Sequence, residues 1–265
     1  FLHWSTCGVF GKPYAASSGE KCNLPFNEKN SSPKNSPFDR DAPEGSYLVN
    51  DYSVTKWKQE QIAWRFHREH GLPLTVIRPA PIYGPGSDYG HGGIILSINR
   101  GLVPFIPADA RNFITTSVHV DDVAGFAVFA SDRKETIGED YNVVDDSIIS
   151  YAEFLHYIAL LLGRRMWDAW FLYLPLMKPS LKAAAKLWLM LEQRFHVPRV
   201  RVLEVGSAPY ISSSYWIANN KTTEAGYVYR YPDVRVGLRD TIQWFREVGW
   251  LDPSYNPHGI WMENI

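Results

Sequence analysis

The sequence predicts an α/β fold built around a parallel sheet. Short runs rich in β-branched residues alternate along the chain with longer segments of helical periodicity, which is the pattern of βαβ units. Leu74–Arg78 and Tyr141–Val144 are two such runs, and Pro79–Gly86 breaks the first one at once. In open parallel sheets the carboxyl ends of the strands carry the ligand-binding loops. The chain has 265 residues, 45% of them hydrophobic, which is enough for one large core with an appended lobe.

Composition and charge exclude several classes of function. The formal net charge is -1 and no dense Lys/Arg run occurs, so we expect no nucleic-acid partner. The two cysteines, Cys7 and Cys22, are too few for a disulfide framework or a four-ligand zinc site, and we expect no metal. No apolar run reaches about 18 residues, and the first residues lack the pattern of a signal peptide. A reducing, cytoplasmic location is expected.

The first part of the chain predicts a strand, a long loop and a helix. Phe1–Val9 passes from apolar residues into a polar turn, as a buried strand does at its end. Residues 12–46 are rich in Ser, Asn, Pro, Gly and Lys, and this loop is either a substrate lid or a surface insertion. Asn50 or Asp51 can cap the helix that follows, and Gly71 can end it.

The remaining elements follow from the same signals. Ser150 and Glu153 have the spacing of a capping box at the start of a helix. Besides the two strands named first, the expected elements are a helix over Ile94–Arg100, a strand over Asn112–Val120, a helix over Val123–Ala130, a helix over Ser150–Leu162 and a closing helix over Val236–Val248.

One segment, Trp167–Phe195, is crowded with aromatic and aliphatic residues. Lys178, Pro179, Lys182 and Lys186 interrupt it, so it does not read as a membrane span. An amphipathic helical pair packed on the core is one interpretation. A wall for a hydrophobic substrate, or peripheral membrane contact through residues 167–191, is the other.

The stretch Asn50–Lys56 carries the strongest candidate for chemistry. Tyr52 and Lys56 are four residues apart at the head of a predicted helix, so their side chains share a face. A lysine cation in that position favours the ionised phenol and readies its hydroxyl to exchange a proton with an alcohol or carbonyl oxygen. The pair alone is common on solvated helices, so the flanking motifs decide its meaning.

Four motifs follow one another along the chain. They are Ser5-Thr-Cys-Gly-Val-Phe-Gly11, Tyr52-Ser-Val-Thr-Lys56, Ile77-Arg-Pro-Ala-Pro-Ile-Tyr-Gly-Pro85 and Val118-His-Val-Asp-Asp-Val-Ala124. Together they resemble the extended short-chain dehydrogenase/reductase family, which comprises NAD(P)-dependent epimerases, dehydratases and hydroxysteroid dehydrogenases. Their order and separation match the family over most of the chain. The resemblance implies a doubly wound, Rossmann-like sheet with a smaller, mostly helical substrate lobe.

The resemblance also implies the residues of an active site. Thr6 would hydrogen-bond the substrate oxygen, Tyr52 would be the general acid/base, and Lys56 would hold the nicotinamide ribose. The turn of Pro79, Ala80 and Pro81 would lie against the nicotinamide ring of NAD or NADP. The substrate would be a small molecule, and a homodimer is a further expectation.

Three charged or polar residues of these motifs have two interpretations. Arg78, His119 and Asp121 either form a buried ion-pair or hydrogen-bond network that fixes loop geometry, or they contact ligand directly. The network is the favoured interpretation. We expect neither cysteine to take part in the chemistry.

The sequence departs from the family at one point. The family begins with a Gly-x-x-Gly-x-x-Gly turn that binds the cofactor pyrophosphate at a helix N-terminus, and residues 1–265 contain no such motif. The amino-terminal part of the sheet is therefore expected to be missing. Residues 1–145 are then the later portion of the dinucleotide-binding domain, and residues 146–265 the substrate lobe, with some segments returning to the core.

Three functions follow from this reading. The first is an oxidoreductase that interconverts a secondary alcohol and a ketone on a hydrophobic, sterol-like substrate, as in the 3β-hydroxysteroid dehydrogenase branch. The second is a sugar-nucleotide epimerase or dehydratase of the same family. The third is a non-catalytic binding or scaffold protein that has lost the dinucleotide turn.

Overall fold

The structure of the protein is a computed structural model that describes residues 1–13, 27–28, 33–35, 41–42, 46–173, 183, 187, 190, 194 and 216–252. Its strands are β1 (Leu2–Trp4), β2 (Lys12–Pro13), β3 (Ser46–Tyr47), β4 (Thr75–Pro79), β5 (Ile82–Tyr83), β6 (Phe105–Pro107), β7 (Ile114–Thr115), β8 (Val118–His119), β9 (Glu139–Val143), β10 (Ile149–Ser150) and β11 (Trp167–Ala169). Its α-helices are α2 (Asp51–His70), α3 (His91–Asn99), α4 (Val120–Ser131), α5 (Tyr151–Leu162), α8 (Asn220–Glu224) and α9 (Val234–Glu247). Short 3-10 helices are η1 (Cys7–Phe10), η3 (Pro33–Asn35), η4 (Ala108–Asn112) and η5 (Lys134–Thr136).

The chain divides into two compact units. Unit 1 contains Phe1–Ile82, Thr116–Ile148 and Tyr215–Val234, and unit 2 contains the remaining segments, Tyr83–Thr115, Ile149–Ser214 and Arg235–Ile265. The chain therefore passes between the units several times. Residues 83–115 lie before the domain boundary expected near residue 145, yet they belong to unit 2. They are part of the connection between the parallel strands β4 and β9, and such a connection leaves the sheet before the chain returns to it.

Unit 1 is organised by a parallel sheet in the order β1-β4-β9. Leu2 is the partner of Thr75 in one ladder, and Thr75 is the partner of Glu139 in the other. All five residues of β4 are buried, as expected for the central strand of a sheet covered on both sides. The predicted α/β fold with a parallel sheet is confirmed.

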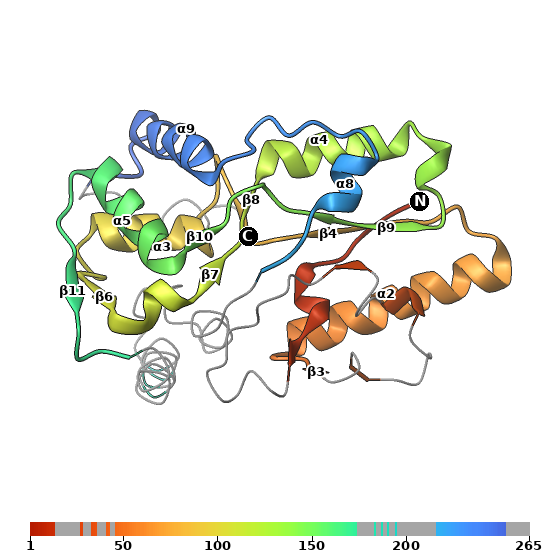
Figure 1. The fold of residues 1–265 in the computed structure, drawn as a ribbon, viewed down its shortest axis with the longest axis horizontal. Coiled ribbons are helices and arrows are strands. Elements are labelled where there is room, and N and C mark those ends of the chain that lie inside the picture. The colour runs from red at the N-terminus through yellow and green to blue at the C-terminus, as the bar shows by residue number, and fades with distance from the viewer. Residues whose placement is uncertain are drawn as a thin grey trace. The chain divides into compact units, whose positions relative to one another are not determined.

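Alternating residues of β4 face different helices. Val76 packs with Trp64 of α2, whereas Ile77 packs with Phe126 of α4. Because successive side chains of a strand point to opposite faces, α2 and α4 must cover opposite faces of the sheet. Figure 1 shows this arrangement, with α4 above the strands and α2 below them.

Helix α2 begins and ends as its sequence predicts. The side chain of Asn50 accepts a hydrogen bond of 2.9 Å from the backbone N–H of Ser53, which satisfies one of the free donors at the start of the helix. Gly71 ends the helix in the left-handed region at φ 67°, a conformation that glycine adopts without steric cost. These two residues fix the range within which Tyr52 and Lys56 are helical.

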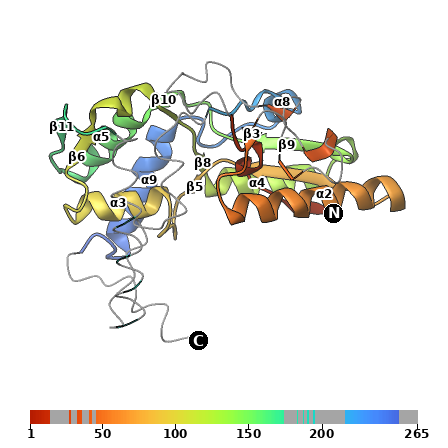
Figure 2. The same cartoon turned by 90° about the horizontal axis from the view of Figure 1, so that it is seen from below.

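Unit 2 holds the helices α3, α5 and α9, which Figure 2 shows grouped together. The rings of His91 in α3 and Phe154 in α5 have centroids 4.6 Å apart, and Arg239 in α9 donates a 2.7 Å hydrogen bond to the hydroxyl of Tyr157 in α5. Helix α5 starts with the predicted capping box of Ser150 and Glu153. The predictions for this helix and its cap are confirmed.

One predicted strand is wrong. The expected strand over Asn112–Val120 is two short strands, β7 and β8, and its last residue already belongs to α4. The interruption falls at the buried polar pair Thr116 and Ser117, where the chain changes units and the backbone carbonyl of Ser117 accepts a hydrogen bond from the N–H of Asp145.

The beginning of the apolar segment Trp167–Phe195 is a strand. Trp167–Ala169 forms β11, paired in parallel with β6, whereas the described residues 183, 187, 190 and 194 are helical. Backbone pairing with β6 thus overrides the helical periodicity of the apolar residues. Most of the segment beyond Tyr173, and most of the loop at 12–46, lie outside the described residues.

We predict that Asn50→Ala lowers the free energy of unfolding by about 1 kcal/mol, because the first turn of α2 loses its side-chain acceptor. The measurements are urea unfolding and amide hydrogen exchange. Ser150→Ala removes the equivalent cap of α5 and is the matched control. Faster exchange over 51–56 is expected in Asn50→Ala alone, and equal exchange in both variants would contradict the prediction.

Candidate active site

The carboxyl ends of three parallel strands meet at one edge of the sheet in unit 1. The N–H of Ser5, just after β1, donates to the carbonyl of Ile77 over 2.8 Å, and the N–H of Ala80, just after β4, donates to Val143 over 3.1 Å. Thr6 and the turn that follows β4 therefore lie on neighbouring strands at the same edge. This is the position at which open α/β sheets bind ligands.

Thr6 caps the short helix η1. Its backbone is extended, with φ -159° and ψ 149°, and its Oγ1 accepts a hydrogen bond of 3.2 Å from the N–H of Gly8. A hydroxyl that accepts one hydrogen bond can still donate its own hydrogen to a further oxygen. The half-buried side chain of Thr6 thus offers a donor at the strand end.

Gly11 ends this turn at a place where a side chain does not fit. Its φ is 66°, and a Cβ atom there would lie 2.6 Å from the carbonyl oxygen of Tyr47. The strand β2 that begins one residue later pairs with β3, so the close approach holds the turn after β1 against the segment that leads into α2.

Tyr52 and Lys56 lie in the first two turns of α2. Lys56 donates from Nζ to the carbonyl of Trp4 over 3.0 Å, which brings the lysine to the end of β1, two residues before Thr6. Tyr52 is 55% exposed, and its hydroxyl has no hydrogen-bond partner within the described part of the chain. The structure thus places the lysine beside the strand end and leaves the phenol open to solvent.

The turn after β4 combines buried and exposed residues. Pro79 and Ala80 are buried, whereas Pro81 is exposed and its carbonyl accepts a 3.1 Å hydrogen bond from the N–H of Val118. Of the three residues assigned to this turn, Pro81 is the exposed one.

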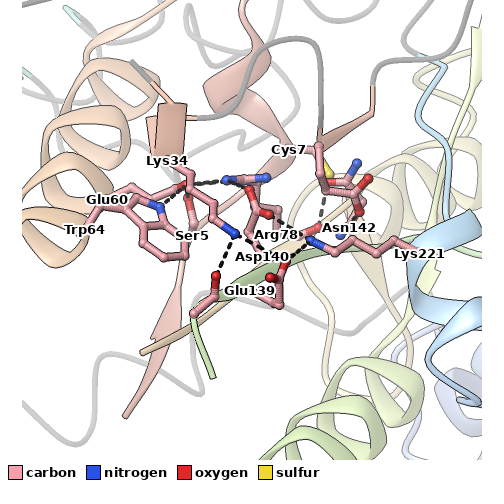
Figure 3. A network of polar contacts seen from close by, with 12 residues as sticks. Ser5, Cys7, Lys34, Glu60, Trp64, Arg78, Glu139, Asp140, Asn142 and Lys221 are labelled. Carbon is pink, nitrogen blue, oxygen red and sulfur yellow. Dashed lines mark hydrogen bonds and ion pairs between the residues drawn. The ribbon is translucent and has the colours of Figure 1, made fainter. Parts of the chain in front are cut away.

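A buried network of charged side chains lies directly beneath this edge (Figure 3). Arg78, with a fully buried side chain, donates to both carboxylate oxygens of Glu60 in α2 and, over 2.7 Å, to Asp140 in β9. Burial opposes the charge of the guanidinium, but the two carboxylates outweigh it and raise the pKa of Arg78 above its ordinary value. Of the two interpretations of Arg78, the structure favours the buried network.

The network continues outward through two lysines. Lys221 of α8 contacts Asp140 over 3.0 Å and Glu139 over 2.7 Å, and Lys34 contacts Glu139 over 3.2 Å. Partly exposed cations therefore balance the negative charge on the outer side of Asp140. The inner carboxylate, Glu60, has Arg78 as its cationic partner in these contacts.

His119 and Asp121 fix the start of α4. His119 is 1% exposed, its Nδ1 accepts from the N–H of Asp121 over 3.2 Å, and its ring lies 3.9 Å from that of Tyr231 between centroids. The carboxylate of Asp121 pairs with Arg230 over 3.2 Å. His119 is thus part of a buried hydrogen-bond network, whereas the ion pair of Asp121 with Arg230 is exposed.

The sequence reasoning missed the role of Asp122. This fully buried carboxylate accepts hydrogen bonds from the N–H groups of Arg230 and Tyr231 over 2.7 and 2.9 Å and from the hydroxyl of Tyr227 over 3.2 Å. The sequence contained one indication of this role. Asp122 stands beside Asp121 in the first turn of an apolar helix, and a second carboxylate there indicates a specific hydrogen-bond partner.

Cys7 is buried and hydrogen-bonded. Its thiol is 1% exposed and donates to the carbonyl of Arg78 over 3.1 Å. Burial raises the pKa of the Cys7 thiol well above its ordinary value, so the thiolate is disfavoured. The other cysteine, Cys22, lies outside the described residues.

The described residues contain no cluster of three or more His, Cys, Asp or Glu side chains arranged to hold a metal ion. The same part of the chain has no helix long and apolar enough to cross a membrane.

The motifs and the strand-end geometry agree with a comparison against known families. The profile of the NAD dependent epimerase/dehydratase family matches residues 1–143, and the chain belongs to this family. Among curated proteins it is similar to the UDP-glucose 4-epimerase of Vibrio cholerae, with 23% identity over 49% of this chain and 38% of that enzyme. It is also similar to tetraketide alpha-pyrone reductase 2 of Arabidopsis thaliana, with 33% identity over 33% of this chain and 27% of that enzyme.

Solved structures of low sequence identity share the fold. The UDP-glucuronic acid 4-epimerase of Bacillus cereus in complex with NAD superposes with a TM-score of 0.62 at 15% identity, over 97% of this chain and 63% of that one. The chain thus spans less than two thirds of the length of these relatives.

The site residues suit one half of a nicotinamide dinucleotide. A solvent-open phenol, an ammonium at the end of β1 and an exposed proline after β4 are groups that fit a nicotinamide and its ribose. The sequence of 265 residues contains no glycine-rich turn of the kind that holds a pyrophosphate. The fit is therefore limited to the nicotinamide half, with Tyr52, Lys56 and Pro81 as the residues that would hold it.

We predict that Arg78→Met lowers the free energy of unfolding by about 3–5 kcal/mol, because Glu60 stays buried with only the neutral donors of Ser5 and Trp64. Urea unfolding at neutral pH measures the loss.

The same substitution at Arg111 is the matched control. Arg111 pairs with Asp168 over 2.7 Å, the distance of the Arg78–Asp140 pair, but both side chains are more than half exposed. An exposed pair contributes about 0–1 kcal/mol. Equal losses in Arg78→Met and Arg111→Met would show that the buried network does not stabilise unit 1.

Proposed function

We propose that the protein catalyses the NAD(P)-dependent interconversion of a secondary alcohol and a ketone. The observation that carries the proposal is the contact of Lys56 with the end of β1, which brings the helix bearing Tyr52 to the strand end bearing Thr6. Family membership, established over residues 1–143, supports the same assignment.

Each residue has a defined task in the proposed oxidation. Tyr52, as phenolate, takes the proton from the alcohol O–H, and the hydroxyl of Thr6 donates a hydrogen bond to the same oxygen. The ammonium of Lys56 would hold the hydroxyls of the nicotinamide ribose. The dinucleotide, when bound, supplies the hydride acceptor for the carbinol carbon. In the reduction the same residues act in reverse, and Tyr52 returns the proton.

A hydrophobic, sterol-like substrate is the first candidate. Trp167, Trp170 and Phe171 of unit 2 are 59%, 79% and 59% exposed, which is unusual for aromatic side chains of this size. Such side chains suit an apolar ligand. They would also suit peripheral membrane contact, which we propose for the same residues. A homodimer remains a prediction.

A nucleotide sugar is the second candidate. The V. cholerae relative is named a UDP-glucose 4-epimerase, and the superposed B. cereus structure is a UDP-glucuronic acid 4-epimerase. The A. thaliana relative, in contrast, is named a reductase of an alpha-pyrone. The scaffold alternative rests on the missing glycine-rich turn, and the shared placement of Thr6 and Lys56 argues against it.

We predict that Tyr52→Phe lowers alcohol oxidation by about 100-fold or more, because the general base loses its only titratable group. The assay is reduction of NAD or NADP by a panel of secondary alcohols, with melting temperature recorded in parallel. Tyr89→Phe removes a hydroxyl from another exposed tyrosine and should leave turnover unchanged. Wild-type turnover in Tyr52→Phe would remove Tyr52 from the mechanism.

We predict that the enzyme turns over a sterol or comparably hydrophobic alcohol faster than a nucleotide sugar. The measurement compares both substrate classes at equal cofactor concentration. Faster turnover of a UDP- or GDP-sugar than of any hydrophobic alcohol would exclude the sterol-like assignment and leave the family assignment in place.

A further inference from the structure

Glu60 is the point at which three elements of unit 1 meet. Its carboxylate is 0% exposed. One oxygen accepts from the hydroxyl of Ser5 over 2.6 Å and from Nε of Arg78 over 3.1 Å. The other accepts from the indole N–H of Trp64 over 3.2 Å and from a second nitrogen of Arg78. Four donors from the end of β1, from β4 and from α2 itself therefore converge on one side chain, as Figure 3 shows.

Each partner of Glu60 in another element lies close in the chain to a proposed site residue. Ser5 directly precedes Thr6, and Arg78 lies three residues before Pro81. Within the helix, Glu60 follows Lys56 by four residues and Tyr52 by eight, so the three side chains form one row on the same helix face. Glu60 therefore contacts the residue next to Thr6 and lies about one and two helical turns from Lys56 and Tyr52, the other groups proposed to act on substrate.

The contacts of Glu60 permit α2 little freedom to rotate against the strands. A buried carboxylate must keep its donors, because an unpaired charge in the interior costs several kcal/mol. Rotation of α2 by one residue turns the side chain by about 100° away from Ser5 and Arg78. A second contact between α2 and the end of β1, from Lys56 to the carbonyl of Trp4, is exposed and therefore weaker. Glu60 therefore restrains the register of the helix against the strand ends.

We propose that Glu60 is a positioning residue for the reaction. Its carboxylate holds the end of β1 and the end of β4 against α2, and so fixes the separation of Thr6 from Tyr52 and Lys56. The inference rests on the proposed function for its catalytic consequence, but the positioning itself concerns only contacts within unit 1.

The first test compares two carboxylates that share Arg78. Glu60→Gln removes the carboxylate of α2 that binds Ser5 at the end of β1, and Asp140→Asn removes the carboxylate of β9 that pairs with Arg78 and Lys221. Both variants should lose thermal stability. At a temperature at which both variants are folded, Glu60→Gln should lower kcat at least about tenfold and leave KM within twofold of the wild-type value. A catalytic group that is slightly misplaced slows the chemical step more than it weakens substrate binding. Asp140→Asn should keep kcat within twofold. Equal losses of kcat would overturn the proposal.

The second test uses two mild substitutions and needs no substrate. Ser5→Ala and Trp64→Phe each remove one neutral donor to Glu60, but only Ser5 lies at the strand end. In residues 1–265, amide exchange should rise at 5–11 and at 50–57 in Ser5→Ala and in Glu60→Gln, and should stay at the wild-type rate there in Trp64→Phe. Unchanged exchange in Ser5→Ala and Glu60→Gln would overturn the positioning role. An active Tyr52→Phe enzyme, by contrast, would overturn the proposed function and leave this exchange result standing.

Discussion

The buried guanidinium of Arg78 is the constraint on which unit 1 depends. A cation with no exposed surface is stable only when carboxylates and hydrogen-bond acceptors surround it, and here they come from α2 and β9 on either side of β4. Both the order of the strands in the sheet and the position of α2 therefore depend on the charge of Arg78. Hydrophobic contacts such as Val76 with Trp64 supply most of the favourable free energy, but they are less directional.

The sequence was sufficient where local signals and structure coincide. The cap at Asn50, the glycine at the end of α2 and the β-branched run of β4 each depend on residues a few positions apart, and each prediction held. The position of Thr6 and Pro79 at one edge of the sheet also follows from the predicted ends of the strands alone. The contact of Ser5 with Glu60 spans 55 residues, so no local pattern could indicate it.

The errors have a common physical origin. Propensity predicted one strand over Asn112–Val120, but two buried hydroxyl residues there mark the passage from one unit to the other. Periodicity favoured a helix at Trp167, but pairing with β6 made that residue part of a strand. In both cases tertiary context, which a single sequence does not show, outweighed an intrinsic preference.

The carboxylate of Asp122 has a consequence for how the protein is made. It is satisfied by the backbone of Arg230 and Tyr231, which follow it by 108 and 109 residues. Until a ribosome has released that stretch, Asp122 lacks these donors and the neighbouring hydrophobic cluster lacks Ile217 and Tyr229. Unit 1 therefore completes its fold only after residue 231 has been released, and nascent chains that stall before this residue expose apolar surface of the kind that chaperones bind.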